Sequence, residues 1–159
     1  TGLSGVCSAG TTACTAGAIA CTQNTQPSAE LCDGLDNNCD GIVDNVPLGV
    51  AALTAEKSGA AAQLTWTTLA SATSYDVTRG VLSTLSSSGG DFTPSVDACV
   101  ANGQAGTTAA DATSAPPDDG FWYLVRGNNC GGPGGYDEGV ASQSGSRDAE
   151  IDASALACP

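Results

Sequence analysis

Residues 30–44 carry the sequence ELCDGLDNNCDGIVD. These fifteen residues hold five carboxylates, two amides and two cysteines, and they include no positively charged side chain. Carboxylates held this close together without a counter-charge repel one another at neutral pH. A bound hard cation removes that repulsion, because carboxylate and amide oxygens are the ligands that such a cation prefers. The stretch therefore predicts a loop that folds around a metal ion.

The spacing of the oxygen-bearing residues indicates which cation the loop binds. Asp36, Asn38 and Asp40 occupy every second position. Gly41 follows directly, and Asp44 comes three residues later. These are positions 1, 3, 5, 6 and 9 of a calcium loop of the EF-hand type, in which position 7 binds through its backbone carbonyl. The predicted cofactor is calcium, and the predicted ligand residues are Asp33, Asp36, Asn38, Asp40, Ile42 and Asp44.

The match to an EF-hand ends after position 9. Position 12 is Pro47, where an EF-hand has a bidentate glutamate, and no helix is expected on either side. We therefore expect a stand-alone calcium loop, similar in ligand spacing to dockerin and thrombospondin type 3 loops. The missing carboxylate could come from Asp33, from Glu30 or from elsewhere in the fold. The alternative interpretation is an acidic, solvated turn without a metal.

The cysteine content indicates an oxidising compartment. The chain has eight cysteines and no histidine, and no CxxC pair is present. Zinc would then need four cysteine ligands, so disulfides are the favoured interpretation. The sequence lacks a long apolar run and a signal segment, so we expect a secreted protein, extracellular or on the cell surface, with Thr1 as the start of the processed chain and no membrane insertion.

Several pairings of these cysteines are open. Cys32 and Cys39 flank the acidic loop, and a disulfide between them would pin the loop closed, although either could pair elsewhere. A bridge from Cys99 to Cys130 would tie two segments of the second domain together. Cys158 could then pair with an N-terminal cysteine. Because five cysteines precede residue 47, at least one is free, pairs with the second domain or bonds another chain.

The charge excludes two classes of partner. The net charge is −13, with −5 in residues 1–46 and −8 in residues 47–159. Binding to nucleic acid and to anionic lipid both need clustered Lys and Arg, and the chain has only four such residues. Calcium is a natural counter-ion for an acidic surface.

Composition changes near residue 47, which predicts two domains: a Cys-rich metal-binding module over residues 1–46 and a β-sandwich over residues 47–159. The second region alternates apolar and polar residues between Gly-, Ser- and Pro-rich turns, as short antiparallel strands do. The predicted strands are residues 50–55, 62–67, 74–79, 81–85, 107–111, 120–126 and 147–151.

The second region resembles a fibronectin type III domain. The resemblance is carried by the segments Leu64–Trp66, Ser74–Val77 and Trp122–Asn128, followed by a Gly-rich loop. It departs from the family in its cysteines and in an insertion over about residues 86–104. The resemblance implies that the following residues form the core: Trp66, Tyr75, Val77, Leu124 and either Trp122 or Tyr123. The fold class expected for the chain is mostly β, a small disulfide-rich calcium-loop module followed by this fibronectin type III-like sandwich.

Residues 30–44, preceded by a Gly-x-Cys-x-x-Gly element, also resemble a repeat of bacterial secreted and surface proteins that is described as metal-binding. One family that contains the repeat is associated with copper-binding surface proteins. The resemblance implies metal contacts at Asp33, Asp36, Asn38, Asp40 and Asp44. Copper prefers imidazole, thioether or thiolate ligands, and the chain has no His and no Met.

Catalytic signals are absent from the sequence. Without His, neither a Ser-His-Asp nor a Cys-His arrangement can form. The remaining acids, Asp118-Asp119, Asp137-Glu138 and the alternating Asp148, Glu150 and Asp152, could form a second ion site, but a solvated edge is the favoured interpretation.

These observations predict a non-enzymatic, extracellular, calcium-binding structural protein of a bacterial cell surface. Its more specific form would be a self-assembling filament or layer subunit, a homo-oligomer or polymer in which the uncharged segment Thr1–Gly5 could contact a neighbour. The alternatives are a carbohydrate- or protein-binding adhesion module and a surface protein that binds copper or another transition metal.

Overall fold

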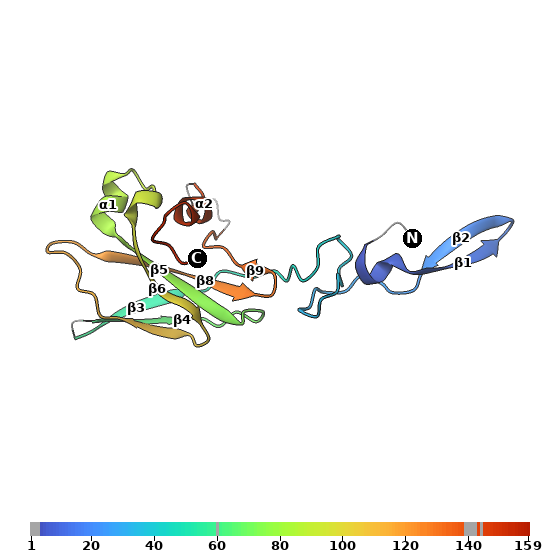
Figure 1. The fold of residues 1–159 in the computed structure, drawn as a ribbon, viewed down its shortest axis with the longest axis horizontal. Helices are drawn as coiled ribbons and strands as arrows, with labels where there is room; N and C mark the ends of the chain where they lie inside the picture. Colours follow the sequence, from blue (N-terminus) through green and yellow to red (C-terminus); the bar gives the residue numbers. More distant parts are fainter. Residues whose placement is uncertain (1–3, 60, 139–142, 144) are drawn as a thin grey trace. The chain divides into compact units, whose positions relative to one another are not determined.

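The computed structural model describes residues 4–59, 61–138, 143 and 145–159. The fold is mostly β, with antiparallel sheets and three disulfides. It divides into two compact units (Figure 1). The first comprises Thr1–Pro47 with Cys130–Gly132, and the second comprises Leu48–Asn129 with Pro133–Pro159. Most of the segment Thr1–Gly5 lies outside the described residues.

The first unit consists of a short helix, a hairpin and an irregular acidic loop. The 3-10 helix η1 spans Gly5–Ser8, and strands β1 (Gly10–Thr15) and β2 (Ala18–Gln23) form an antiparallel hairpin. Ala16 and Gly17 connect the strands, both with positive φ, as a tight two-residue hairpin turn requires. Residues 24–52 contain no helix or strand, so the expected absence of a helix on either side of the acidic loop is confirmed.

The second unit contains two sheets and two short α-helices. Strands β3 (Leu53–Ser58), β4 (Ala61–Trp66) and β7 (Thr108–Asp111) form one sheet in the order β3-β4-β7. The other sheet has the order β6-β5-β8-β9, with β6 at Val96–Gln104, β5 at Ser74–Val81, β8 at Phe121–Asn129 and β9 at Gly132–Pro133. The helical elements are α1 (Leu82–Ser87), η2 (Thr93–Ser95) and α2 (Arg147–Asp152).

The main core of this unit is built from both sheets. Leu64 and Trp66 alternate along β4, so both side chains point to one face, where they meet Tyr75, Val77 and Val125. The rings of Trp66 and Tyr75 contact edge to face, with centroids 5.7 Å apart. The prediction that Trp66, Tyr75 and Val77 are core residues is confirmed.

A second cluster packs beneath α2. Val96, Trp122, Tyr136 and Ile151 are buried together, and Leu124 packs against them. Gly80 is required beside Trp122, because a Cβ at position 80 would lie 2.1 Å from the indole Cζ2. The aromatic residue of β8 that is buried is thus Trp122, while Tyr123 is half-buried beside the main core.

Two predicted strands are helices. Residues 147–151 belong to α2, because Ser146 caps the helix by accepting a hydrogen bond from the Ala149 N–H, and Ile151 is buried. Residues 82–85 begin α1, which follows β5 directly. The expected insertion over residues 86–104 forms η2 and strand β6, so it contributes an edge of the larger sheet.

The disulfides pair Cys7 with Cys39, Cys32 with Cys130, and Cys99 with Cys158. The expected pairs 32–39 and 99–130, and a bond from Cys158 to the N-terminal module, are therefore wrong. The chain returns at Cys130–Gly132 to the first unit, which brings Cys130 to Cys32. Cys14 and Cys21 carry free, exposed thiols. In the described part of the chain, no helix is long and apolar enough to cross a membrane.

Candidate metal centre

Asp36 lies at the centre of the acidic loop. Asp36 is only 3% exposed, and its Oδ2 accepts a hydrogen bond from the Gly41 N–H at 3.0 Å. Its Oδ1 is buried and has no hydrogen-bond partner among the described residues. A buried carboxylate oxygen without a partner is costly, and a bound cation would satisfy it.

Helix η1 buries this carboxylate. The Val6 N–H donates to the Asp36 backbone carbonyl at 3.1 Å, and the Cys7–Cys39 disulfide fastens the helix to the loop. Gly5 makes the approach possible, because a Cβ at that position would lie 2.2 Å from the Asp36 carbonyl oxygen. Helix η1 thus shields Asp36, which is position 1 of the calcium frame, from water.

Asn38 and Asp40 bend the loop at alternate residues. The Asn38 Oδ1 accepts from the Asp40 N–H, and the Asp40 Oδ1 accepts from the Ile42 N–H, each at 2.9 Å. The Asn45 Nδ2 donates to the Asp40 Oδ2 at 2.7 Å. The bonds from Asn45 and Ile42 hold the pKa of Asp40 below its usual value, because they stabilise the ionised carboxylate.

Asp33 and Asp44 close the ends of the loop. The Asp44 Oδ1 accepts from the backbone N–H groups of Asp33 and Gly34 at 3.0 and 2.9 Å. The Asp33 Oδ1 accepts from the Leu35 N–H at 2.9 Å and from the Asn37 Nδ2 at 3.0 Å. Both carboxylates therefore hold the loop backbone in its curved form.

Glu30 has a structural role that sequence reasoning missed. Its two carboxylate oxygens accept from the backbone N–H groups of Asn37 and Asn38, each at 3.1 Å, and the residue is buried. Both oxygens of Glu30 therefore hold the loop backbone at Asn37 and Asn38. The sequence carries no signal for this role, because the hydrogen bonds come from backbone N–H groups, which every residue except proline has.

The donors of the calcium frame are drawn into one short loop, but they are not a finished coordination shell. Among the described residues, no three His, Cys, Asp or Glu side chains gather as a ready-made metal site. The Oδ1 atoms of Asn38 and Asp40 instead accept hydrogen bonds from the backbone N–H groups two residues further along the chain. The donor chemistry nevertheless fits calcium, since every candidate atom is a hard oxygen and the Asp36 Oδ1 has no hydrogen-bond partner in the described part of the chain.

The acidic pairs outside the loop are engaged in turns. Asp119 accepts from the Ser83 and Gly120 N–H groups, and Asp137 accepts from the Ser146 hydroxyl and the Arg147 N–H. These hydrogen bonds hold turns of the second unit in place, so Asp119 and Asp137 serve separate turns.

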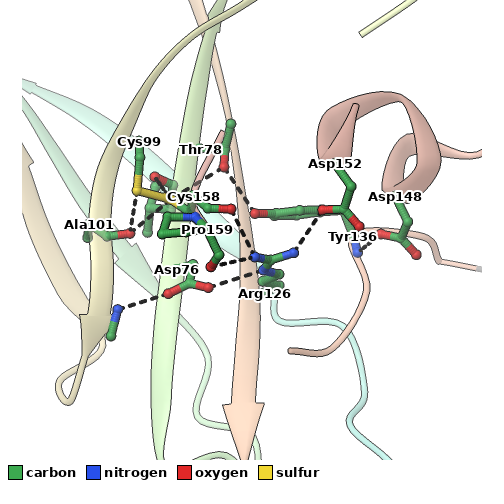
Figure 2. A network of polar contacts seen from close by, with 12 residues as sticks. Asp76, Thr78, Cys99, Ala101, Arg126, Tyr136, Asp148, Asp152, Cys158 and Pro159 are labelled. Atoms are coloured by element: carbon green, nitrogen blue, oxygen red, sulfur yellow. Dashed lines mark hydrogen bonds and ion pairs between the residues drawn. A yellow bond between two sulfur atoms is a disulfide. The ribbon is translucent and has the colours of Figure 1, made fainter. Parts of the chain in front are cut away.

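A buried polar network, centred on Arg126, lies in the second unit. Arg126 is 4% exposed and donates to Asp76 at 3.1 Å and to Asp152 at 3.0 Å (Figure 2). It also donates to the backbone carbonyls of Cys158 and Pro159 at 3.1 and 3.3 Å. The network therefore holds the C-terminal segment against strand β8.

The neighbours of Arg126 in Figure 2 extend the network through Tyr136. The guanidinium lies 5.3 Å from the centre of the Tyr136 ring, and the Tyr136 hydroxyl lies 3.0 Å from the Thr78 hydroxyl. Asp148 accepts from the Tyr136 backbone N–H. The interpretation of Asp148, Glu150 and Asp152 as a solvated strand edge is wrong, because each bonds to a group elsewhere in the unit.

A second arginine is buried at the other end of the sheet. Arg79 donates to Asp111 at 2.7 Å and also pairs with Asp97, while the Tyr123 hydroxyl donates to Asp111 at 3.0 Å. Burial and the bond to Asp111 raise the pKa of Tyr123 to about 12. Both arginines are largely buried and paired with carboxylates, so loss of either arginine would leave a buried carboxylate without its counter-charge.

Comparisons of the chain with protein-family models, with curated proteins and with solved structures find no match.

Proposed function

We propose that the chain is a non-enzymatic structural protein of a bacterial cell surface, and that calcium stabilises its first unit. The observation that carries the proposal is the buried Asp36 Oδ1, which has no hydrogen-bond partner in the described residues and belongs to position 1 of the calcium frame. Calcium would supply the positive charge that the loop lacks. Asp36, Asn38, Asp40, Asp44 and the Ile42 carbonyl would hold the ion, with Asp33 beside them.

The placement outside the cell is supported by the three disulfides, which are typical of oxidising compartments. A loop without the bidentate ligand at position 12 fits weak binding, with a dissociation constant on the order of 10⁻⁴–10⁻³ M, as in other extracellular modules. Copper is disfavoured because the donors are oxygens and the chain has no His or Met.

The second unit is proposed to be a fibronectin type III-like spacer. Its first, second and fifth strands form one sheet, and its third, fourth, sixth and seventh strands form the other. This order is that of an immunoglobulin-like sandwich whose fourth strand has joined the C, F and G strands. Trp66 on the second strand, packed on Tyr75 of the third, supports the same assignment.

Calcium titration calorimetry on the disulfide-intact protein tests the site. One calcium ion should bind per chain, magnesium should bind more weakly because it needs stricter octahedral geometry, and Asp36→Asn should abolish the calcium heat. Glu56→Gln is the matched control, since it removes one exposed carboxylate from strand β3. Equal calcium binding by Asp36→Asn and Glu56→Gln would overturn the assignment of the site.

A further inference from the structure

The hairpin β1–β2 carries two thiols on one face. In its register, Cys14 lies opposite Ile19 and Cys21 lies opposite Thr12. Side chains alternate between the two faces of a strand, so these four residues share one face. Cys14 and Cys21 are exposed and free, whereas the other six cysteines form disulfides.

The same register disfavours a bond between the two thiols of one chain. Cys14 and Cys21 are diagonal neighbours, two positions out of direct opposition. Diagonal residues on paired antiparallel strands are about 7–8 Å apart, while cysteines whose Cα atoms are more than about 7 Å apart cannot be bridged without backbone movement. The partner of each thiol is therefore best supplied by another molecule.

The charge distribution indicates that this molecule is a second copy of the chain. Residues 1–29 contain no charged side chain, although the whole protein has a net charge of −13. Two copies repel one another over their acidic surfaces, but the hairpin offers a neutral surface on which they can meet. Its side chains are mostly Thr and Ala, and Ile19, on the thiol face, is 82% exposed.

The hairpin also lacks groups that would oppose contact with a second copy. Its two six-residue strands contain no charged side chain and no proline. Within the first unit the hairpin extends away from η1 and the acidic loop (Figure 1), and all but one of its strand residues are exposed.

We propose that the thiol face of β1–β2 joins two copies of the chain through two disulfides, each between Cys14 of one copy and Cys21 of the other. A two-fold axis parallel to the face and perpendicular to the Cys14–Cys21 diagonal places each Cys14 over the partner's Cys21, which gives a closed, self-complementary interface. The inference supplies a contact surface for the self-assembling subunit that the sequence predicts, and it does not depend on calcium.

The chemistry is thiol–disulfide exchange with a low-molecular-weight disulfide such as oxidised glutathione. A cysteine thiolate attacks the glutathione disulfide, forms a mixed disulfide and releases one reduced glutathione. The partner's thiolate then attacks the protein sulfur and releases the second. For each interchain bond, two protein thiols are oxidised and one glutathione disulfide is reduced to two thiols.

The full chain is incubated with oxidised glutathione, separated by non-reducing electrophoresis and mapped by peptide mass spectrometry. We expect wild type to form a dimer that contains a Cys14–Cys21 linked peptide. Cys14→Ser alone and Cys21→Ser alone should remain monomeric, because each remaining thiol faces a serine. A mixture of the two variants should form a heterodimer with one disulfide, and this complementation separates the proposed geometry from random crosslinking.

Three results would overturn the proposal. They are a wild-type monomer with free thiols, a wild-type monomer with an internal Cys14–Cys21 bond, and single variants that dimerise as readily as their mixture. The Cys14→Ser/Cys21→Ser protein serves as a folding control and should keep its calcium-dependent melting temperature. A wild type that stays monomeric while calcium still raises its melting temperature would therefore count against this inference alone.

Discussion

The Gly41 N–H donates to the Asp36 Oδ2 at 3.0 Å and holds the carboxylate inward, with its Oδ1 buried and without a partner among the described residues. Gly41 adopts φ +98°, which an L side chain rarely adopts, so glycine lets the loop turn sharply enough for this bond. The loop is thus organised around an oxygen that the described residues leave without a hydrogen-bond partner.

Asp36→Asn tests that relationship. The amide keeps the size of the carboxylate and can keep the Gly41 bond, but it removes the negative charge that calcium would neutralise. With calcium at one hundred times its dissociation constant, the wild type should gain about 2.7 kcal/mol, and the variant should gain almost none. Melting curves recorded with and without calcium measure this difference. An equal calcium-induced shift in both proteins would contradict the role of Asp36.

Glu30 should matter for loop order without being a ligand. Glu30→Ala leaves the Asn37 and Asn38 N–H groups without their acceptors, which should cost about 1–3 kcal/mol for each group that stays buried. Hydrogen exchange of these two amides should become faster, while exchange in strand β5 should not change. Glu56→Ala is the control for loss of an exposed acid. Unchanged protection of both amides would show that Glu30 does not hold the loop.

Replacing Arg126 should cost more stability than replacing the less buried Arg147. Arg126→Met leaves the buried Asp76 carboxylate without its ion-pair partner, so unfolding in urea should show a loss of about 3–5 kcal/mol. Arg147→Met should cost less than about 1 kcal/mol, because Arg147 pairs at 3.7 Å with the exposed Glu138. Adding Asp76→Asn to Arg126→Met should restore part of the loss. Equal losses for the two arginines would contradict the importance of the buried network.

Tyr123 should make stability fall at alkaline pH. Its pKa rises from 10.0 to about 12 on folding, so between these values the unfolded chain releases a proton that the folded chain retains. The contribution of the protonated Tyr123 to the free energy of unfolding is complete below pH 10 and is lost as the pH rises toward 12. Tyr123→Phe should therefore lose less stability over this range than wild type, as measured by rapid urea unfolding. Identical pH profiles would contradict the raised pKa.

Local patterns were predictable from sequence, and long-range pairings were not. The alternation in residues 62–67 and 74–79 matches strands β4 and β5, since the two-residue period of a strand is a local property, although β5 is buried along most of its length. In residues 147–151 the same period misleads, because the segment is too short to distinguish a strand from a helix, and the Ser146 cap decides the outcome.

The disulfides and buried ion pairs depend on the tertiary fold. Cys32 bonds Cys130, which is 98 residues away, and Arg126 pairs with Asp76 across neighbouring strands. Cα separations of this kind cannot be obtained from residue spacing. The calcium frame is a local pattern of alternating residues, so it could be proposed from the sequence, whereas the burial of Asp36 by η1 depends on the fold.

The most direct test of the calcium site is a thermal melt of the disulfide-intact protein in calcium and in chelator, with metal analysis of the purified chain. If calcium occupies the site at Asp36, the purified protein should hold about one calcium ion per chain. Its melting temperature should then fall clearly when the chelator removes that ion. Identical melting curves together with no bound calcium would contradict it, and residues 30–44 would then be a solvated turn held by its own hydrogen bonds.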